Sequence, residues 1–151
     1  MSLLPYFSSS SKVWESRDWI FGIEEIGYTG WEIVADGNYR LDDPVNFAAI
    51  RENLASTDLL VTVHAPYSDL NLASLNYPIW RESIRQICCC ICHAAELTDR
   101  VTIHPGFVSP MGKLVPEKVW EMQKTALVEI GRYAEDHGVL ACVENMINIR
   151  D

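Results

Sequence analysis

The sequence has 151 residues, of which 48% are hydrophobic and 22% charged, a composition typical of one globular domain. Its net charge of −9, with only 12 Lys and Arg residues, weighs against a nucleic-acid partner without excluding a local basic patch. No apolar run reaches the roughly 18 residues that a bilayer span needs. No basic segment precedes an apolar one, as it would in a secretory signal. We therefore expect a cytoplasmic protein without a membrane-spanning segment.

The apolar periodicity predicts strands and helices that alternate along the chain. Gly27 follows an apolar stripe with helical spacing and offers a C-cap, while Asp43-Pro44 is a typical N-cap and first turn. Alternation of this kind is typical of a parallel sheet. The expected strands are 3–8, 31–35, 59–64, 101–104 and 140–144, and the expected helices are 13–26, 43–55, 78–97 and 116–137.

Two connecting segments, 65–77 and 107–115, are long for loops between a strand and a helix. Long loops at this end of a parallel sheet usually carry function.

Four of the five cysteines are crowded into Cys88-Cys89-Cys90-x-Cys92. A zinc site usually needs paired Cys-x-x-Cys elements, and the sequence has one cluster with His93 beside it. On a helix, Cys88 shares a face with several isoleucines and is expected to pack, whereas Cys89 and His93 lie on the other side. We expect ordinary reduced thiols here, with a metal as the less favoured alternative.

Three short apolar runs end in residues that bind metals. They end in His64, His104 and Glu144, which are spaced by 40 residues, from 64 to 104 and from 104 to 144. One strand, one helix and two loops account for this length, so the three residues should lie at the carboxyl ends of consecutive parallel strands. Active sites of βα-barrels are built there. Two imidazoles and a carboxylate that meet at this edge predict a site for a divalent metal.

Side-chain alternation along the strands supports this interpretation. His64 shares its face with Thr62, and His104 shares its face with Thr102, while the neighbouring valines and isoleucine face the helices. A single histidine at a strand end is more often a structural residue. Three such residues at matching positions are harder to explain by packing, because burying them without partners costs several kcal/mol.

Other polar residues extend this predicted site. We assign Glu32, Tyr67 and Asn145 to substrate binding. Glu32 and Asp36 belong to the second strand and its end, where a salt-bridged or solvent-facing role is an equal alternative. Asn145 follows Glu144 and either orients a ligand or caps the next loop.

The motifs His64-Ala-Pro-Tyr, His104-Pro-Gly and Glu144-Asn, in this order, resemble those of the xylose-isomerase-like TIM barrels. That superfamily includes sugar-phosphate isomerases and epimerases as well as endonuclease-IV-type DNA repair enzymes. The endonuclease branch implies zinc ligation by His64, His104 and Glu144. The isomerase branch implies that Glu144 binds one divalent metal and helps to move the substrate proton, while the histidines contact substrate. The resemblance thus implies catalytic roles for Glu144 and His64, with zinc or manganese as the metal and magnesium as an alternative.

The sequence departs from the endonuclease pattern, because Phe107 and Met146 stand where that branch usually has Ser and Thr. Together with the acidic charge, this favours a metal-dependent isomerase or epimerase of a sugar or sugar phosphate. The alternatives are a zinc-dependent phosphodiesterase that acts on abasic DNA, and a catalytically inactive barrel used for binding.

The expected fold is a TIM (β/α)8-type barrel of which this chain supplies five strands and four helices. An eight-unit barrel needs about 250 residues, so we expect residues 1–151 to be a single domain that forms the N-terminal portion of a longer protein. Alone, the fragment should be inactive. Its first and last strands should leave open edges that favour homo-oligomers.

Overall fold

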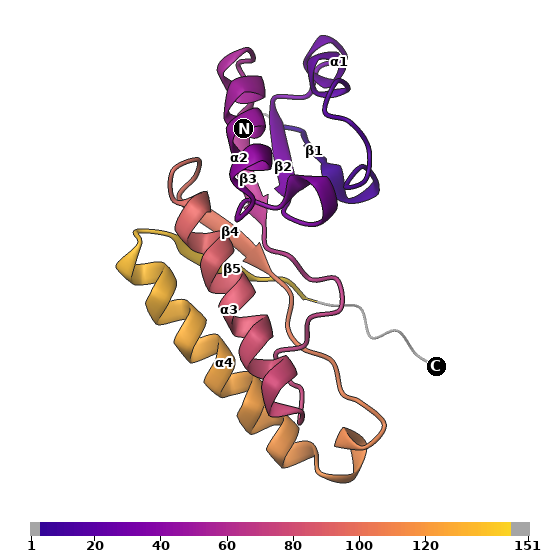
Figure 1. Cartoon of the computed structure of the whole chain (residues 1–151), viewed down its shortest axis with the longest axis vertical. Helices are drawn as coiled ribbons and strands as arrows, with labels where there is room; N and C mark the ends of the chain where they lie inside the picture. The colour runs from indigo at the N-terminus through magenta and orange to yellow at the C-terminus, as the bar shows by residue number, and fades with distance from the viewer. Residues whose placement is uncertain (1–3, 146–151) are drawn as a thin grey trace.

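The computed structural model describes residues 4–145, in which strands and helices alternate along the chain (Figure 1). This order confirms the predicted α/β architecture. The strands are β1 (Tyr6–Ser8), β2 (Gly30–Val34), β3 (Leu60–His64), β4 (Arg100–Ile103) and β5 (Leu140–Val143). The helices are α1 (Ile20–Glu25), α2 (Pro44–Ala55), α3 (Tyr77–Ala94) and α4 (Pro116–Asp136), with short 3₁₀ turns η1 (Ser9–Ser11), η2 (Gly37–Tyr39) and η3 (Gly112–Leu114).

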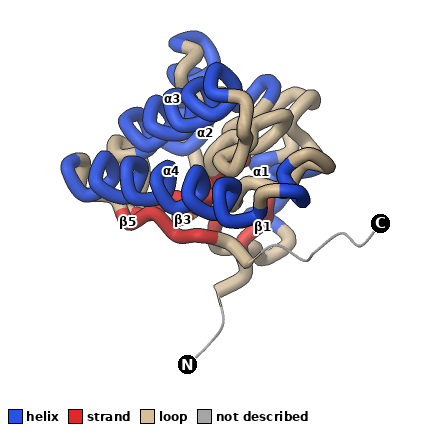
Figure 2. The backbone as a smooth tube through the Cα atoms, turned by 90° about the horizontal axis from the view of Figure 1, so that it is seen from below, coloured by secondary structure: helices blue, strands red, loops and turns tan. Residues whose placement is uncertain are grey.

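The five strands form one parallel sheet in the order β1-β2-β3-β4-β5. The helices lie on one side of this sheet (Figure 2). Each strand therefore pairs with the next strand in sequence, and the connecting helix covers the same face each time. This is the wall of a βα-barrel, with β1 and β5 as its edges within residues 4–145.

The two faces of the sheet differ in burial as the alternation of side chains predicted. The helix-facing residues Trp31, Val63 and Val101 are fully buried. On the opposite face, Leu60 is 51% exposed and Leu140 is 64% exposed. The core therefore lies between the sheet and the helices. The other face, which would line a barrel interior, is exposed at the amino-terminal ends of β3 and β5.

The predicted helix over 13–26 is wrong in its first half. Only Ile20–Glu25 is helical, and the preceding residues form turns. The Val13 carbonyl accepts a hydrogen bond of 2.7 Å from the Asn38 amide, and Trp19 Nε1 donates to the Tyr39 hydroxyl at 3.0 Å. These contacts with the segment after β2 hold residues 12–19 in a form that their own periodicity does not favour.

The helix ends confirm the predicted caps. Asp43 Oδ1 accepts hydrogen bonds from the amides of Val45 at 2.9 Å and Asn46 at 3.0 Å, and Pro44 occupies the first turn of α2. Gly27 adopts a φ of 97° after α1, a left-handed conformation that glycine adopts without steric strain. Over the described residues, no helix has the length and apolar character to cross a membrane.

Candidate metal centre

The structure brings His64, His104 and Glu144 together at the carboxyl end of the sheet. The Nε2 atoms of His64 and His104 lie 3.2 and 3.1 Å from the same atom, Oε2 of Glu144. The two imidazole rings stand edge to face with centroids 4.6 Å apart. The three potential ligand atoms lie within 4.8 Å of one another.

The parallel register produces this convergence. Residue 64 of β3 pairs with residue 102 of β4, and residue 103 pairs with residue 143 of β5. His104 and Glu144 therefore follow their strands at the same level, and the Glu144 amide donates to the Ile103 carbonyl at 3.0 Å. Since adjacent parallel strands point the same way, three side chains with the same parity reach one place.

The hydrogen bonds of His64 leave its Nε2 without a proton in the neutral ring. Its Nδ1 lies 2.8 Å from the Ala65 carbonyl, which only accepts, so Nδ1 carries the hydrogen. The lone pair of Nε2 then faces Glu144 Oε2, another acceptor, at 3.2 Å. This arrangement directs two potential ligand atoms toward one place.

The electrostatics favour the ligand form of His104. Burial lowers the pKa of His104 and the neighbouring His64 lowers it further, while Glu144 acts in the opposite direction. A neutral imidazole is the form that binds metals. Two imidazoles and one carboxylate, with further positions open, match the ligand sets of catalytic zinc and other first-row divalent ions.

Tyr67 packs against both histidine rings of the cluster. Its ring stacks on His104 with centroids 4.5 Å apart and meets His64 edge to face at 5.1 Å. Burial raises the pKa of Tyr67, and the carboxylates of Asp36, Glu144 and Glu32 raise it further. The predicted substrate residue Tyr67 is thus neutral and fixes the orientation of both imidazoles.

Asp36 holds the backbone of Tyr67 and Ser68 through hydrogen bonds. The residue is 8% exposed, and its Oδ2 accepts hydrogen bonds from the amides of Tyr67 at 3.2 Å and Ser68 at 3.3 Å, and from the Ser68 hydroxyl at 3.0 Å. Asp36 therefore holds the start of the loop after β3. The sequence left its role open, and its place at the end of β2 was the available signal.

Asn71 connects the two loops that carry the histidine motifs, and Gln123 connects the second of these loops to α4; neither role was predicted from the sequence. Asn71 Oδ1 accepts from the Phe107 amide at 3.0 Å, and Asn71 Nδ2 donates to the Phe107 carbonyl at 3.0 Å. Gln123 Oε1 accepts from the Gly106 amide at 2.6 Å. Asn71 is 6% exposed and Gln123 is 5% exposed. Their partners lie 36 and 17 residues away in the chain, so no local pattern in the sequence indicated these contacts.

Glu32 and Asn145 lie outside the ligand group. Glu32 is half-buried on the open face of β2, and its charge acts on Tyr67, while Asn145 is exposed directly after Glu144. Among residues 4–145, the side chains placed to hold one ion are His64, His104 and Glu144. Substrate binding by Glu32, Tyr67 and Asn145 stays a prediction.

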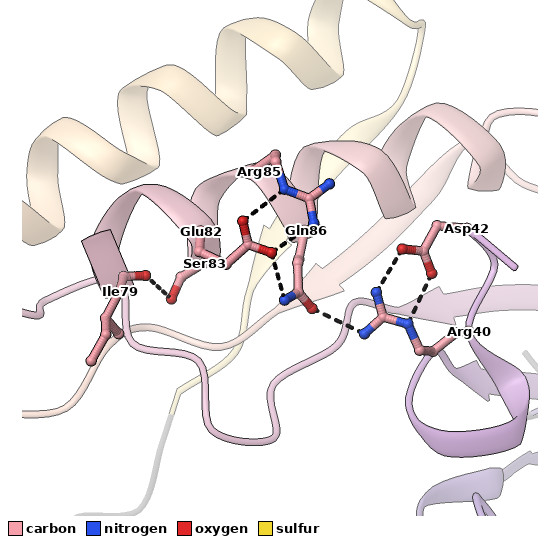
Figure 3. Close-up of polar contacts among 7 residues, drawn as sticks. All are labelled: Arg40, Asp42, Ile79, Glu82, Ser83, Arg85 and Gln86. Carbon is pink, nitrogen blue, oxygen red and sulfur yellow. Dashed lines mark hydrogen bonds and ion pairs between the residues drawn. The ribbon is translucent and has the colours of Figure 1, made fainter. Parts of the chain in front are cut away.

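A polar chain borders the loop after β3 on its other side (Figure 3). Arg40 pairs with Asp42 and donates to Gln86 Oε1 at 3.0 Å, and Gln86 Nε2 donates to Glu82 at 3.0 Å. Beside this chain lies a pocket of about 470 Å³. These contacts connect the segment after β2 to α3.

A one-sided parallel sheet with ligand residues at its carboxyl edge defines a partial βα-barrel. The sequence profile of the xylose isomerase-like TIM barrel family matches residues 22–149, and the chain belongs to this family. The predicted resemblance is thereby confirmed. An uncharacterized protein of Methanocaldococcus jannaschii is 33% identical over 129 residues, which are 85% of this chain and 44% of that protein.

Solved structures agree on the fold. A D-tagatose 3-epimerase-like protein is 31% identical with a TM-score of 0.89, over 98% of this chain and 55% of its own. A Thermus thermophilus protein soaked with ZnCl2 is 22% identical with a TM-score of 0.72, over 96% and 56% of the two chains. The chain thus spans about half the length of the relatives that it matches.

Proposed function

We propose that the protein is a metal-dependent isomerase or epimerase that moves a proton between adjacent carbons of a sugar or sugar phosphate. The observation that carries this proposal is the convergence of His64 Nε2, His104 Nε2 and Glu144 Oε2 at the carboxyl end of adjacent strands. The family and the D-tagatose 3-epimerase-like relative support a sugar as the substrate.

His64, His104 and Glu144 would hold the divalent metal, with zinc or manganese favoured and magnesium as an alternative. The zinc-soaked relative is consistent with this choice. When bound, such an ion polarises the carbonyl and hydroxyl groups of the substrate. The hydrogen bond from His64 Nδ1 to the Ala65 carbonyl would keep Nε2 directed toward such an ion, as an outer partner does for metal-binding histidines.

Glu144 is the proposed proton carrier. Both imidazoles meet its Oε2, which leaves Oε1 available to accept a proton from a substrate carbon. Tyr67 covers the histidines on one side and keeps water from them. Glu32 and Asn145 would bind substrate hydroxyl groups at the rim.

When a proton is removed from one face of a substrate carbon and delivered to the opposite face, the reaction needs a second acid or base opposite Glu144. The strands β1 to β5 surround only one side of the site. We therefore propose that the chain is the N-terminal part of a longer barrel whose further strands supply this group, and that residues 1–151 alone are inactive.

The test is an activity assay of the protein and of its longer form with zinc, manganese or magnesium, against ketoses, aldoses and their phosphates in deuterated water. Metal-dependent interconversion with solvent deuterium at the reacting carbon supports the proposal. Cleavage of an abasic DNA duplex without sugar turnover would assign the phosphodiesterase function instead. Tight metal binding without either reaction would indicate a binding module.

A further inference from the structure

The segment that carries His104 (residues 104–107) follows β4 and lies outside the strands and helices. β4 ends at Ile103, whereas His64 lies within β3. The side chain of His104 is 20% exposed and that of His64 is 6% exposed. The position of His104 therefore depends on what holds residues 105–107 as well as on the sheet.

Asn71 holds the His104 segment from the loop after β3. Its Oδ1 accepts a hydrogen bond from the Phe107 amide at 3.0 Å, and its Nδ2 donates to the Phe107 carbonyl, also at 3.0 Å. The same Oδ1 accepts from the Ala73 amide at 2.9 Å. Both polar groups of the Asn71 side chain thus bind backbone, and they fix the peptide groups on both sides of Phe107.

Asn71 is itself fixed by α3. Its amide donates to Ser83 Oγ at 2.9 Å, and the Ser83 hydroxyl donates to the Ile79 carbonyl at 2.8 Å (Figure 3). Ser83 is fully buried, and Asn71 is 6% exposed. A buried amide with these partners is held in one orientation, because rotation would leave polar atoms unpaired. Asn71 therefore connects the His104 segment firmly to α3.

α4 supplies a second contact with the same segment. Gln123 Oε1 accepts from the Gly106 amide at 2.6 Å, and Gln123 is 5% exposed. Pro105 has no amide hydrogen, so residues 105–107 offer two backbone donors, and buried amide side chains bind both. Gly106 allows this close approach, since a Cβ at its position would lie 2.5 Å from Asn71 Oδ1.

We propose that Asn71 is a positioning residue for His104 as a metal ligand, with Gln123 as a second support. The two amides hold the His104 segment so that His104 Nε2 is directed toward Glu144 Oε2, at 3.1 Å. This inference rests on the proposed function, because it assigns His104 to the metal. A segment that is already ordered loses little conformational freedom when an ion binds, and this raises the affinity for the ion. A purely structural role would affect folding stability alone.

The experiment measures metal binding by the full chain, with zinc against a competing chelator and with cobalt(II), whose visible absorption spectrum reports its ligand geometry. Asn71→Ala should weaken zinc binding by about tenfold, the lower end of the loss that removal of an outer partner of a ligand causes. Gln123→Met keeps the length of the side chain and removes the acceptor of the Gly106 amide, so it should weaken binding to a smaller extent. The cobalt(II) spectra of both variants should differ from that of the wild type, because His104 is no longer held in one geometry.

Asp43→Ala is the matched control for stability. It also removes a side chain that accepts hydrogen bonds from two backbone amides, but at the start of α2. It should lower the free energy of unfolding and leave the zinc affinity and the cobalt(II) spectrum unchanged. Thermal unfolding of every variant defines a temperature at which all are folded, and binding is measured there. Gln123→Met carries the same test if Asn71→Ala does not fold.

Wild-type zinc affinity in folded Asn71→Ala, or in Gln123→Met, would overturn the positioning role and leave the proposed metal site intact. An equal loss of affinity in Asp43→Ala would overturn it as well, because the effect would then follow stability. A wild-type chain that binds no zinc or cobalt(II) would overturn the proposed function, and this inference with it.

Discussion

Glu144 has the central role among the three potential ligands, because both histidines face its Oε2. Replacing Glu144 by Gln keeps the size of the side chain and removes its charge. We expect zinc affinity to fall by more than about 100-fold, more than the loss of an outer partner of a ligand costs. Isothermal titration calorimetry measures this change, with Glu121→Gln on α4 as the control. Equal zinc affinity in both variants would contradict the proposed ligand role.

His104 makes the stability of the metal-free protein depend on pH. Its pKa is lowered from 6.5 in the folded chain, so the unfolded chain binds more protons at this residue. The neutral form of His104 therefore makes its full contribution to the free energy of unfolding above pH 6.5. This contribution is lost as the pH falls below 6.5 toward the lower pKa that His104 has in the folded chain. Urea unfolding in chelator from about pH 8 to pH 5 should show this decline. His104→Gln should reduce the slope, and an unchanged slope would exclude His104 as its source.

Asp36 positions Tyr67 through backbone contacts. Asp36→Ala leaves two amides of a half-buried loop without their acceptor, which should lower the free energy of unfolding by about 1–3 kcal/mol. Ser68→Ala removes one hydroxyl contact and should cost about 1 kcal/mol. Urea unfolding compares the two variants. A larger loss from Ser68→Ala than from Asp36→Ala would contradict this assignment.

The loops after β3 and β4 lie close together at Gly106. A Cβ atom at this position would lie 2.1 Å from the backbone nitrogen of Ala73, which cannot move independently of its loop. We expect Gly106→Ala to lower the free energy of unfolding by about 2 kcal/mol. Gly131→Ala on α4 is the matched control, because a Cβ there meets no atom within 4 Å. It should stabilise the protein by about 0.5–1 kcal/mol, and equal effects of both changes would refute the steric argument.

Elements with strong local signals were predictable from the sequence. The Asp43-Pro44 start of α2 depends on nearby residues, and the convergence of His64, His104 and Glu144 depends on strand parity. Residues 12–19 were not predictable, because their turns depend on contacts with residues 38 and 39. Asp36 and Asn71 were missed as supports, since their partners lie 31 to 36 residues away in the chain.

The open face and the edges of the sheet affect the molecule as a whole. Leu60 and Leu140 are 51% and 64% exposed, and within residues 4–145 the outer edges of β1 and β5 pair with no strand. Exposed apolar surface and free edges promote association. We expect the 151-residue chain to self-associate as its concentration rises, which sedimentation velocity measures.

A double variant tests which surface is responsible for this association. Leu60→Thr with Leu140→Thr should weaken it, whereas Val45→Thr on α2, where Val45 is 77% exposed on the helical side, should not. A monomer at all concentrations would show that the open face does not drive association.

The register that places His104 beside Glu144 would link the proposed metal affinity to folding accuracy. A slip of β4 by one residue against its neighbours would turn His104 to the helical side and separate it from the other ligands. Only a chain in which three consecutive strands have aligned correctly could then bind the proposed ion. Metal content in a purified sample would therefore measure the fraction of molecules with a correctly aligned sheet, independently of any catalytic assay.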